Sequence, residues 1–370
     1  MKSKDGQLGF FRRLTIIAIA AALFAVACEP ADVEPISTET PTESTGKGDG
    51  WYWCDFRGLE SQTSESWRHS VASWLIVKTG DPHHRGTDAI FNPDQAMVLI
   101  GKFAYGAIDK DLKDEKVRVY LRSGTCDPFA LLGTVYTSDD GQYGSIFGIQ
   151  DDGGRAFFQI PWQNAPGIGR YDVKMVVAGD LSMTETFSLT VVPKGKKAVV
   201  FDIDGTLTTS DGELIKDIVD ELLTDGDSYD QKMYPNADTV VAAYAQKGYQ
   251  VIFLSARPDI LTALTRSWLS SRGFADGVLH LNETESDFVK GSEATISYKA
   301  RYLAYLKNEV GLDIVYAYGN ATTDIAAYER AGIAKSRTFI IGSHAGEEGT
   351  RPLTSYTSHL PFLDTVPFAD

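Results

Sequence analysis

The sequence predicts a two-domain protein in which an N-terminal antiparallel β-sandwich precedes an α/β domain built on a parallel sheet. The chain has 370 residues, enough for two domains of ordinary size. Residues 51–193 contain short apolar or alternating runs at intervals of about ten residues. Residues 194–345 instead alternate apolar strands with segments of helix length. Hydrophobic residues make up 43% of the chain and charged residues 23%, which is typical of globular proteins.

The first 28 residues are expected to be a targeting segment. Two arginines precede an apolar run at residues 14–27, which is shorter than the roughly 20 residues that span a bilayer and has the size of a signal-peptide core. The run ends at Cys28 and is similar to bacterial lipoprotein signals, in which that cysteine is lipidated. The alternative is ordinary signal-peptidase cleavage with an incidental cysteine. Residues 29–50 are expected to be a flexible tether, so the sequence predicts an exported outer-membrane lipoprotein of the bacterial cell envelope.

Export would leave two cysteines, Cys54 and Cys126, in an oxidising compartment. A bond between them would close a loop of roughly 73 residues and stabilise the fold by about 4 kcal/mol on the chain-entropy model. The alternative is a pair of buried thiols. The sequence therefore favours a disulfide in the first domain.

The first domain, residues 51–193, is expected to be an immunoglobulin-like sandwich. Its apolar runs are separated by Gly, Asp, Asn and Pro turns, the spacing typical of antiparallel sheets. Segment 66–77 can be read as a helix or as a strand. The tryptophans in this region are expected to pack in the core or at a domain interface.

The second domain is expected to have a parallel sheet that is covered on both faces. Its strands are expected at residues 198–201, 251–254, 277–281, 314–318 and 338–341, and its helices at residues 259–271, 295–309 and 323–330. Residues 346–370 are expected to be a C-terminal tail that packs on this domain. Ligands of such sheets bind beyond the carboxyl ends of the strands, so the polar residues at those ends are the candidates for a site.

Two carboxylates, Asp202 and Asp204, follow the first strand of the parallel sheet. At positions i and i+2 of an extended segment they point the same way, and Gly205 allows the chain to turn there. Two like charges this close are costly unless a cation lies between them. Ser255 ends the second strand, Lys299 lies on a helix, and Asn320 and Asp324 follow the strand at 314–318. Oxygen donors of this kind suit Mg²⁺, and Lys with Ser suits a phosphate.

These residues resemble, in order, the four motifs of the haloacid dehalogenase (HAD) phosphohydrolase superfamily. The first is DIDGT at residues 202–206, and it is followed by Ser255, Lys299 and GNATTD at 319–324. The resemblance implies that Asp202 is a nucleophile that forms an aspartyl-phosphate. It also implies that Asp204 is the general acid and then the general base.

The same resemblance assigns supporting roles to the remaining residues. Mg²⁺ would be held by Asp202, by the main-chain carbonyl of Asp204, and by Asn320, Asp324 or both. Lys299 would offset charge on the phosphoryl oxygens, and Thr206 and Ser255 would donate hydrogen bonds to them. Arg257 would contact the phosphate or a headgroup, and the alternative for Arg257 is an ion pair with a nearby carboxylate.

A closer resemblance is to the lipin-type catalytic domain of Mg²⁺-dependent phosphatidate phosphatases. The stretches DIDGTLTTSD, SAR and GNATTD carry it. Residues 85–345 look still more like the C-terminal region of membrane-associated, retinal-degeneration-B-type phosphatidylinositol transfer proteins. That resemblance implies a domain that binds phosphatidic acid without hydrolysing it, because those proteins lack the first catalytic Asp. Here Asp202 and Asp204 are both present.

The sequence therefore predicts a Mg²⁺-dependent phosphatase of phosphatidic acid or a related phospholipid, brought to the membrane by its lipidated N-terminus. Only about 40 residues separate 208 from 249, which leaves no room for a large cap over the site. Two alternatives remain, a phosphatidic-acid-binding module with little turnover and a broad-specificity exported acid phosphatase. A net charge of −15 excludes nucleic acid as a partner.

Overall fold

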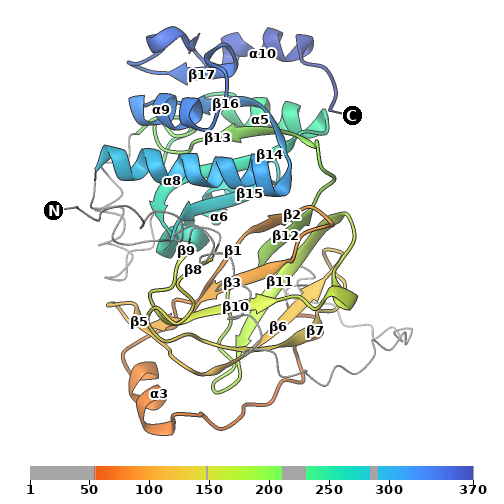
Figure 1. Ribbon diagram of the computed structural model, residues 1–370, viewed down its shortest axis with the longest axis vertical. Coiled ribbons are helices and arrows are strands. Elements are labelled where there is room, and N and C mark those ends of the chain that lie inside the picture. The colour runs from red at the N-terminus through yellow and green to blue at the C-terminus, as the bar shows by residue number, and fades with distance from the viewer. Residues whose placement is uncertain (1–53, 55, 147–148, 211–230, 284–290, 370) are drawn as a thin grey trace, which may run out of the picture. The chain divides into compact units, whose positions relative to one another are not determined.

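The computed structural model describes residues 54, 56–146, 149–210, 231–283 and 291–369. The expected signal segment, the tether 29–50 and Cys28 lie outside the described residues, so the fold does not bear on them. Among the helices that are described, none has the length and apolar character needed to cross a bilayer. The described residues form one compact unit, which contains both the sandwich and the parallel sheet (Figure 1).

The sandwich consists mainly of a five-stranded and a three-stranded sheet (Figure 1). The larger sheet has the order β2 (Ala89–Phe91), β12 (Phe187–Val191), β11 (Gly169–Val177), β6 (Lys116–Arg122) and β7 (Ala130–Tyr136). The smaller has the order β1 (Arg85–Thr87), β3 (Val98–Lys102) and β10 (Arg155–Gln159). Alternation along the strands builds the core between them, and Val117 and Val119 of β6 are fully buried.

Two details of the sandwich differ from the expectation of a purely antiparallel fold without helices. Strand β2 pairs with β12 in parallel, at one edge of the larger sheet. Segment 66–77 contains a helix, α3 (Ser70–Val77). Two small hairpins, β4 (Ala104–Tyr105) with β5 (Lys110–Asp111) and β8 (Ser145–Ile146) with β9 (Ile149–Gln150), complete the domain together with the 3₁₀ turn η1 (Trp162–Asn164). A disulfide joins Cys54 to Cys126.

The second domain has six parallel strands in the order β15, β14, β13, β16, β17, β18. Their bounds are β13 (Lys197–Phe201), β14 (Gln250–Pro258), β15 (Val278–Asn282), β16 (Asp313–Gly319), β17 (Thr338–Ile341) and β18 (Arg351–Leu353). The order reverses between β13 and β16, which are neighbours in the sheet. This reversal is the topological switch point at which doubly wound sheets bind ligands.

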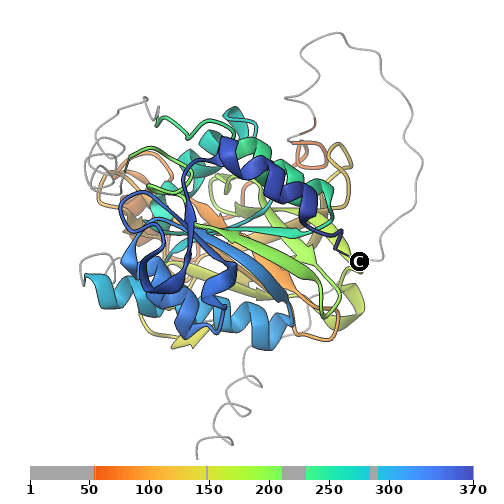
Figure 2. The ribbon, with the colours of Figure 1, turned by 90° about the horizontal axis from the view of Figure 1, so that it is seen from above.

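Helices cover both faces of the parallel sheet, as Figure 2 shows from above. Helices α5 (Ala237–Gln246), α6 (Thr262–Ser271) and α10 (Tyr356–Thr365) pack on one face, and α8 (Ser292–Tyr305) and α9 (Thr322–Arg330) on the other. Strand β13 shows why both faces need cover. Val199 and Phe201 belong to one apolar core, whereas Ala198 and Val200 belong to the other, and all four are fully buried.

Several elements extend beyond what the sequence indicates. Helix α5 begins at Ala237, directly after the helix start that Tyr234, Pro235 and Asn236 indicate, and the sheet continues past residue 345 because β18 pairs with β17. Short helical turns adjoin the helices and strands at η3 (Asp259–Leu261), η4 (Leu306–Val310), η5 (Lys335–Arg337) and η6 (Glu347–Gly349). Strand β14 runs to Pro258, so Arg257 lies within a strand at the edge where the site forms.

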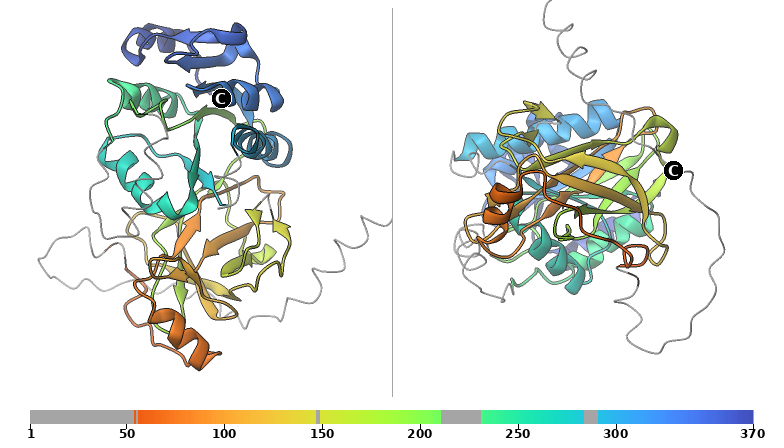
Figure 3. Two further views of the ribbon diagram at one scale, coloured as in Figure 1. Left: turned by 90° about the vertical axis from the view of Figure 1, so that its left-hand side faces the viewer. Right: turned by 90° about the horizontal axis from the view of Figure 1, so that it is seen from below.

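The two domains are joined by hydrogen bonds as well as by apolar contacts, and the left panel of Figure 3 shows the junction from another side. Asp88 of the sandwich accepts a hydrogen bond from the main-chain N–H of Leu279 (2.9 Å) and pairs with Arg266 on α6 (3.1 Å). The amide of Asn92 donates to the carbonyl of Glu309 (2.8 Å). Such buried directional contacts fix the sandwich against the parallel sheet.

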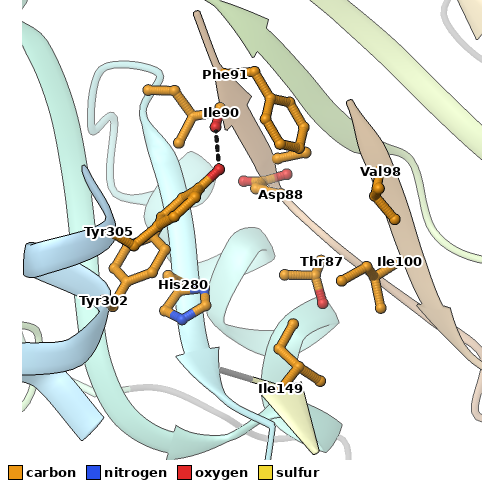
Figure 4. Close-up of a pocket in the computed structure, with 11 residues that line it drawn as sticks. Thr87, Asp88, Ile90, Phe91, Val98, Ile100, Ile149, His280, Tyr302 and Tyr305 are labelled. Carbon is orange, nitrogen blue, oxygen red and sulfur yellow. Dashed lines mark hydrogen bonds between the residues drawn. The ribbon is translucent and has the colours of Figure 1, made fainter. Parts of the chain in front are cut away.

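A small cavity of about 30 Å³ lies at this junction (Figure 4). Tyr305 spans one side of it and donates to the carbonyl of Ile90 (2.8 Å). His280 stacks on Tyr302 with ring centroids 3.5 Å apart. The Nδ1 of His280 lies 3.4 Å from the Oε1 of Glu283, and neither atom forms a hydrogen bond. Burial therefore lowers the pKa of His280 to about 3 and raises the pKa of Glu283 to about 8.

The raised pKa of Glu283 predicts a stability that falls as the pH rises. The unfolded carboxyl group ionises near its ordinary pKa of 4.5, whereas the folded one holds its proton up to about 8, so folding is progressively disfavoured between these values. Glu283→Gln removes this titration. Its melting temperature is expected to exceed that of the wild type by several degrees at pH 8.5 and by much less at pH 5.

Thermal unfolding at both pH values checks this prediction, with Glu309→Gln on the exposed surface as the control. The difference in melting temperature between this control and the wild type is expected to be the same at both pH values. An equal difference at pH 5 and pH 8.5 for Glu283→Gln would contradict the assignment of a buried, protonated Glu283.

Candidate active site

The predicted site residues gather at the carboxyl edge of the sheet, around the switch point between β13 and β16. Asp202 follows β13 directly, and its N–H donates to the carbonyl of Tyr318 on β16 (3.0 Å). Gly205 has a φ of +69°, in the left-handed region that glycine adopts without strain, and it turns the chain over the edge. A cavity of about 400 Å³ opens here, lined by Asp202, Asp204, Ser255, Lys299, Asn320, Asp324 and neighbouring residues.

Lys299 is the central cation of the site. Its Nζ lies 2.7 Å from Oδ1 of Asp202 and 2.6 Å from Oδ1 of Asp324. All three side chains are buried. Burial alone would lower the pKa of Lys299, but the two carboxylates outweigh it and raise that pKa. Burial raises the pKa of Asp202 to about 7, although Lys299 acts in the opposite direction. Lys299 thus holds together two acidic groups that would otherwise repel each other.

Asp324 also shapes the loop that carries Asn320. Its Oδ2 accepts hydrogen bonds from the main-chain N–H groups of Asn320 (3.0 Å) and Ala321 (3.1 Å) at the start of α9. A carboxylate in the first helical turn is favoured by the unpaired N–H groups there. Both oxygens of Asp324 are therefore engaged in the described structure, one by Lys299 and one by the loop.

The hydroxyl of Thr206 contacts one carboxylate oxygen and one side-chain amide oxygen. Its hydroxyl lies 3.0 Å from Oδ2 of Asp202 and 3.2 Å from Oδ1 of Asn320. A hydroxyl has one proton, so it can donate to only one of these acceptors at a time. The carboxylate and amide oxygens therefore face a common point, and both are hard donors of the kind that Mg²⁺ prefers.

The donor set fits a magnesium ion that keeps several waters. Across the described ranges, no three His, Cys, Asp or Glu side chains gather as a ready metal centre. An ion at this site would use Asp202 and Asn320, together with a main-chain carbonyl and water. Mg²⁺ dehydrates reluctantly and is commonly bound through one or two carboxylates, so this sparse set suits it.

Asp204 is held by a different cation from Asp202. The Nε and Nη2 atoms of Arg257 lie 2.9 and 2.8 Å from its two carboxylate oxygens, and the hydroxyl of Ser255 donates to Oδ2 (3.1 Å). Arg257 is 1% exposed and does not line the cavity. Of the two alternatives weighed for Arg257, the structure displays the ion pair with a carboxylate. Ser255 does line the cavity.

Some residues of the site carry no signal in the sequence. Tyr356 of α10 donates from its hydroxyl to the carbonyl of Thr206 (2.9 Å) and so supports the turn after Asp204. Tyr234 and His344 line the cavity, and the Nδ1 of His344 lies 3.0 Å from a carboxylate oxygen of Glu347. These residues come from segments far from the motifs, so only the fold brings them to the site.

The fold and the site together define a β-sandwich joined to a doubly wound α/β domain with an acidic cavity at its switch point. Two family models match the two parts in turn. Residues 82–191 match the β-sandwich domain of PITM 1-3, and residues 199–342 match the LNS2 domain of PITM 1-3. The chain thus carries a β-sandwich domain followed by an LNS2 domain, similar to those of the membrane-associated phosphatidylinositol transfer proteins.

Individual relatives agree with these matches. Membrane-associated phosphatidylinositol transfer protein 1 of Homo sapiens is 31% identical over 281 residues, which cover 75% of this chain and 20% of the relative. Protein retinal degeneration B of Drosophila melanogaster is 29% identical over 310 residues, 82% of this chain and 22% of the relative. The chain therefore spans about a fifth of the length of these relatives.

A likeness to a solved structure, a Pnkp1/Rnl/Hen1 RNA repair complex, is much weaker. It has 20% identity and a TM-score of 0.26, and it covers 37% of this chain and 40% of that chain. Nothing in the assignment of the site rests on it.

The comparisons contradict the prediction of an exported bacterial lipoprotein. The relatives are animal proteins named as membrane-associated phosphatidylinositol transfer proteins and as retinal degeneration B. The signal-peptide and lipoprotein assignments are therefore wrong, and with them the localisation to a bacterial outer membrane. They rested on one short apolar run before a cysteine, in residues outside the described part of the chain, and such a run is a compositional signal only.

The bridging position of Lys299 predicts a strong effect of its removal. Lys299→Met leaves Asp202 and Asp324 buried without a shared cation, which is expected to lower the free energy of unfolding by about 3–5 kcal/mol. Urea denaturation in EDTA measures this change. Added Mg²⁺ is expected to restore part of the loss, because a divalent ion beside Asp202 replaces some of the missing positive charge.

Lys335→Met is the matched control, because Lys335 makes two ion pairs at the surface, with Glu329 and Glu348. Surface pairs contribute little, so this variant is expected to unfold at nearly the same urea concentration as the wild type. Equal destabilisation by the two variants would contradict the role given to Lys299.

Proposed function

We propose that the α/β domain is a HAD-type, Mg²⁺-dependent phosphomonoesterase that acts on a phospholipid with a terminal phosphate, such as phosphatidic acid. One observation carries the proposal. Asp202 and Asp204 line one cavity at the switch point, and each is held by its own buried cation, Lys299 or Arg257. A nucleophile and a proton carrier held side by side are what hydrolysis through a covalent intermediate needs.

In the first step an oxygen of Asp202 bonds to phosphorus while the bond from phosphorus to the ester oxygen breaks. Asp204 gives its proton to the departing alcohol oxygen. In the second step Asp204 takes a proton from a water molecule whose oxygen bonds to phosphorus. The bond to Asp202 then breaks, and inorganic phosphate leaves. Hydrogen bonds from Arg257 hold the carboxyl group of Asp204 at the cavity. The ion pair between them forms after Asp204 has given up its proton and lasts until Asp204 takes a proton from water.

Stabilisation of negative charge is the other requirement of the reaction. Lys299 and Ser255 line the cavity, where Lys299 is expected to offset charge on the phosphoryl oxygens and the hydroxyl of Ser255 to donate to them. We propose the same donation for Thr206, whose buried hydroxyl does not line the cavity but contacts Asp202 and Asn320. Mg²⁺, held by Asp202, Asn320 and the main-chain carbonyl of Asp204, would supply further positive charge at the phosphoryl group. Asp324 fixes the loop of Asn320, with direct ligation as a second possibility.

Several features support a lipid substrate. The relatives are named for membrane association and for phosphatidylinositol transfer, and the matched LNS2 domain contains the proposed site. The net charge of −15 disfavours substrates with extended polyanionic backbones. Residues 211–230, where a cap would be inserted, lie outside the described residues, so the expectation of an uncapped site remains a prediction.

A second candidate is a phosphatidic-acid-binding module with little turnover. The name of the human relative favours it, because it describes transfer rather than hydrolysis. The cavity would then bind the phosphate through Lys299 and the hydroxyls without attack by Asp202. The intact pair Asp202 and Asp204 is the feature that favours catalysis over this alternative.

Phosphate release distinguishes the candidates. The full chain is expected to release inorganic phosphate from vesicles that contain phosphatidic acid in Mg²⁺ and not in EDTA. Asp202→Asn is expected to lower the rate at least about 1,000-fold, because no covalent intermediate can form. The matched control, Asp172→Asn, lies on the sandwich strand β11 and is expected to keep the wild-type rate.

Binding to the same vesicles is measured in parallel by co-sedimentation. Binding without release, equal in the wild type and in Asp202→Asn, would favour the binding module and reject the enzyme. Release from soluble esters alone would reject the lipid substrate and leave the phosphatase chemistry in place.

A further inference from the structure

A buried network of charges links the sandwich to the edge of the parallel sheet. Asp259, in the turn η3 after β14, receives one arginine on each oxygen. The Nε of Arg85 lies 2.9 Å from its Oδ1, and the Nη1 of Arg155 lies 3.5 Å from its Oδ2. Both arginines belong to strands of the smaller sandwich sheet, and both are buried.

Acidic residues of the sandwich also bind these two arginines. Asp109 binds both Nη atoms of Arg85, at 3.0 and 2.8 Å. Asp152 binds the Nε of Arg155 (2.8 Å). Because each arginine has an acidic partner within its own domain, its guanidinium group is already oriented before it meets Asp259. The sandwich thus presents a fixed pair of cations to a single carboxylate of the other domain.

That carboxylate lies two residues from Arg257, which holds Asp204. The Nη1 of Arg257 also donates to the hydroxyl of Thr265 on α6 (3.0 Å), and its Nη2 donates to Oε1 of Gln231 (2.9 Å). The carbonyl of Asp259 accepts a hydrogen bond from the hydroxyl of Thr262 at the start of the same helix (2.6 Å). The segment from Arg257 to Thr265 is therefore one connected unit.

The same unit is attached to the sandwich at a second point. Arg266 of α6 pairs with Asp88 (3.1 Å), whose other oxygen accepts the main-chain N–H of Ser188 on β12 (2.6 Å). The start of α6 is thus bonded on one side to the sandwich, and on the other it supports Arg257. Together these contacts connect Arg85 and Arg155 to the carboxylate of Asp204.

We infer that Asp259 is a positioning residue of the proposed active site, through which the sandwich sets the place of Asp204. Arg85 and Arg155 fix Asp259, Asp259 fixes the turn that carries Arg257, and Arg257 fixes the proton-carrying carboxylate. The β-sandwich is in this sense part of the active site although none of its residues lines the cavity. The catalytic part of this inference rests on the proposed phosphatase function.

Asp259→Asn is the variant that tests the connection. Asparagine keeps the shape of the side chain but weakens both ion pairs, and Arg85 and Arg155 keep their partners Asp109 and Asp152, so the fold is expected to survive. A small displacement of a catalytic group can lower a rate about 100-fold. The kcat for phosphate release from phosphatidic acid vesicles is expected to fall about 10- to 100-fold, with the KM changed less than about threefold.

The control is Asp172→Asn, which weakens a comparable pair with the buried Arg122 in the sandwich, away from the junction (2.9 Å). It is expected to lower the melting temperature without changing kcat. A double-mutant cycle with Asp204→Asn then separates positioning from general destabilisation. Asp259→Asn is expected to lower kcat far less in the Asp204→Asn background than in the wild type, because the group that it positions is already gone.

Hydrogen exchange gives a readout that needs no turnover. Amides in peptides that cover residues 255–265 are expected to exchange faster in Asp259→Asn and at the wild-type rate in Asp172→Asn. If the wild type releases phosphate and Asp259→Asn has the same kcat, the inference is overturned. It is also overturned if Asp259→Asn lowers kcat by the same factor in the wild-type and in the Asp204→Asn background. If the wild type releases no phosphate, the proposed function fails, and unchanged exchange in Asp259→Asn would then overturn the inference separately.

Discussion

The structure of the site depends on how three carboxylates, of which two are buried and one is half-buried, are balanced at one sheet edge. Asp202 and Asp324 share Lys299, and Asp204 has Arg257. Ion pairs of this kind cost desolvation and contribute little net stability compared with apolar packing, but the loss of one member leaves a buried charge without compensation. The requirement for balance therefore explains why residues from β13, β14, α8 and the loop before α9 must meet, whereas apolar packing alone would allow other arrangements.

The position of this cluster follows from the order of the strands. The first strand of the domain lies in the middle of the sheet, with later strands added on both sides. The connections that follow β13 and β16 lead to opposite sides of the sheet and open a space between the carboxyl ends of these two strands. Asp202 at the end of β13 and Asn320 at the end of β16 come together because these strands are adjacent. A doubly wound order thus converts motifs about 120 residues apart into one cavity.

Much of this arrangement was accessible from the sequence because it depends on local patterns. Buried parallel strands are short and apolar, so β13, β16 and β17 could be placed to within one residue of their observed ends. The turn at Gly205 and the clustering of Asp202, Ser255, Lys299 and Asn320 follow from strand ends. Strand β18 could not be placed, because its pattern is weak and its position depends on a sheet that already exists. The N-terminal apolar run led to the wrong localisation for a related reason, since composition without a fold does not determine where a protein is sent.

The sequence does not show which charged side chains form ion pairs with one another. The alternation of Asp202 and Asp204 indicates that they face the same cavity, and it suggests that they share one cation. In the structure each has its own protein cation, and the partner of Asp204 is in turn tied to residues of the other domain. Arg85 and Asp259 are 174 positions apart, so no local pattern connects them. The junction must preserve this connection, which gives a physical reason for the two domains to occur together and in this order. A sandwich that only covered apolar surface would need no paired arginines at its edge.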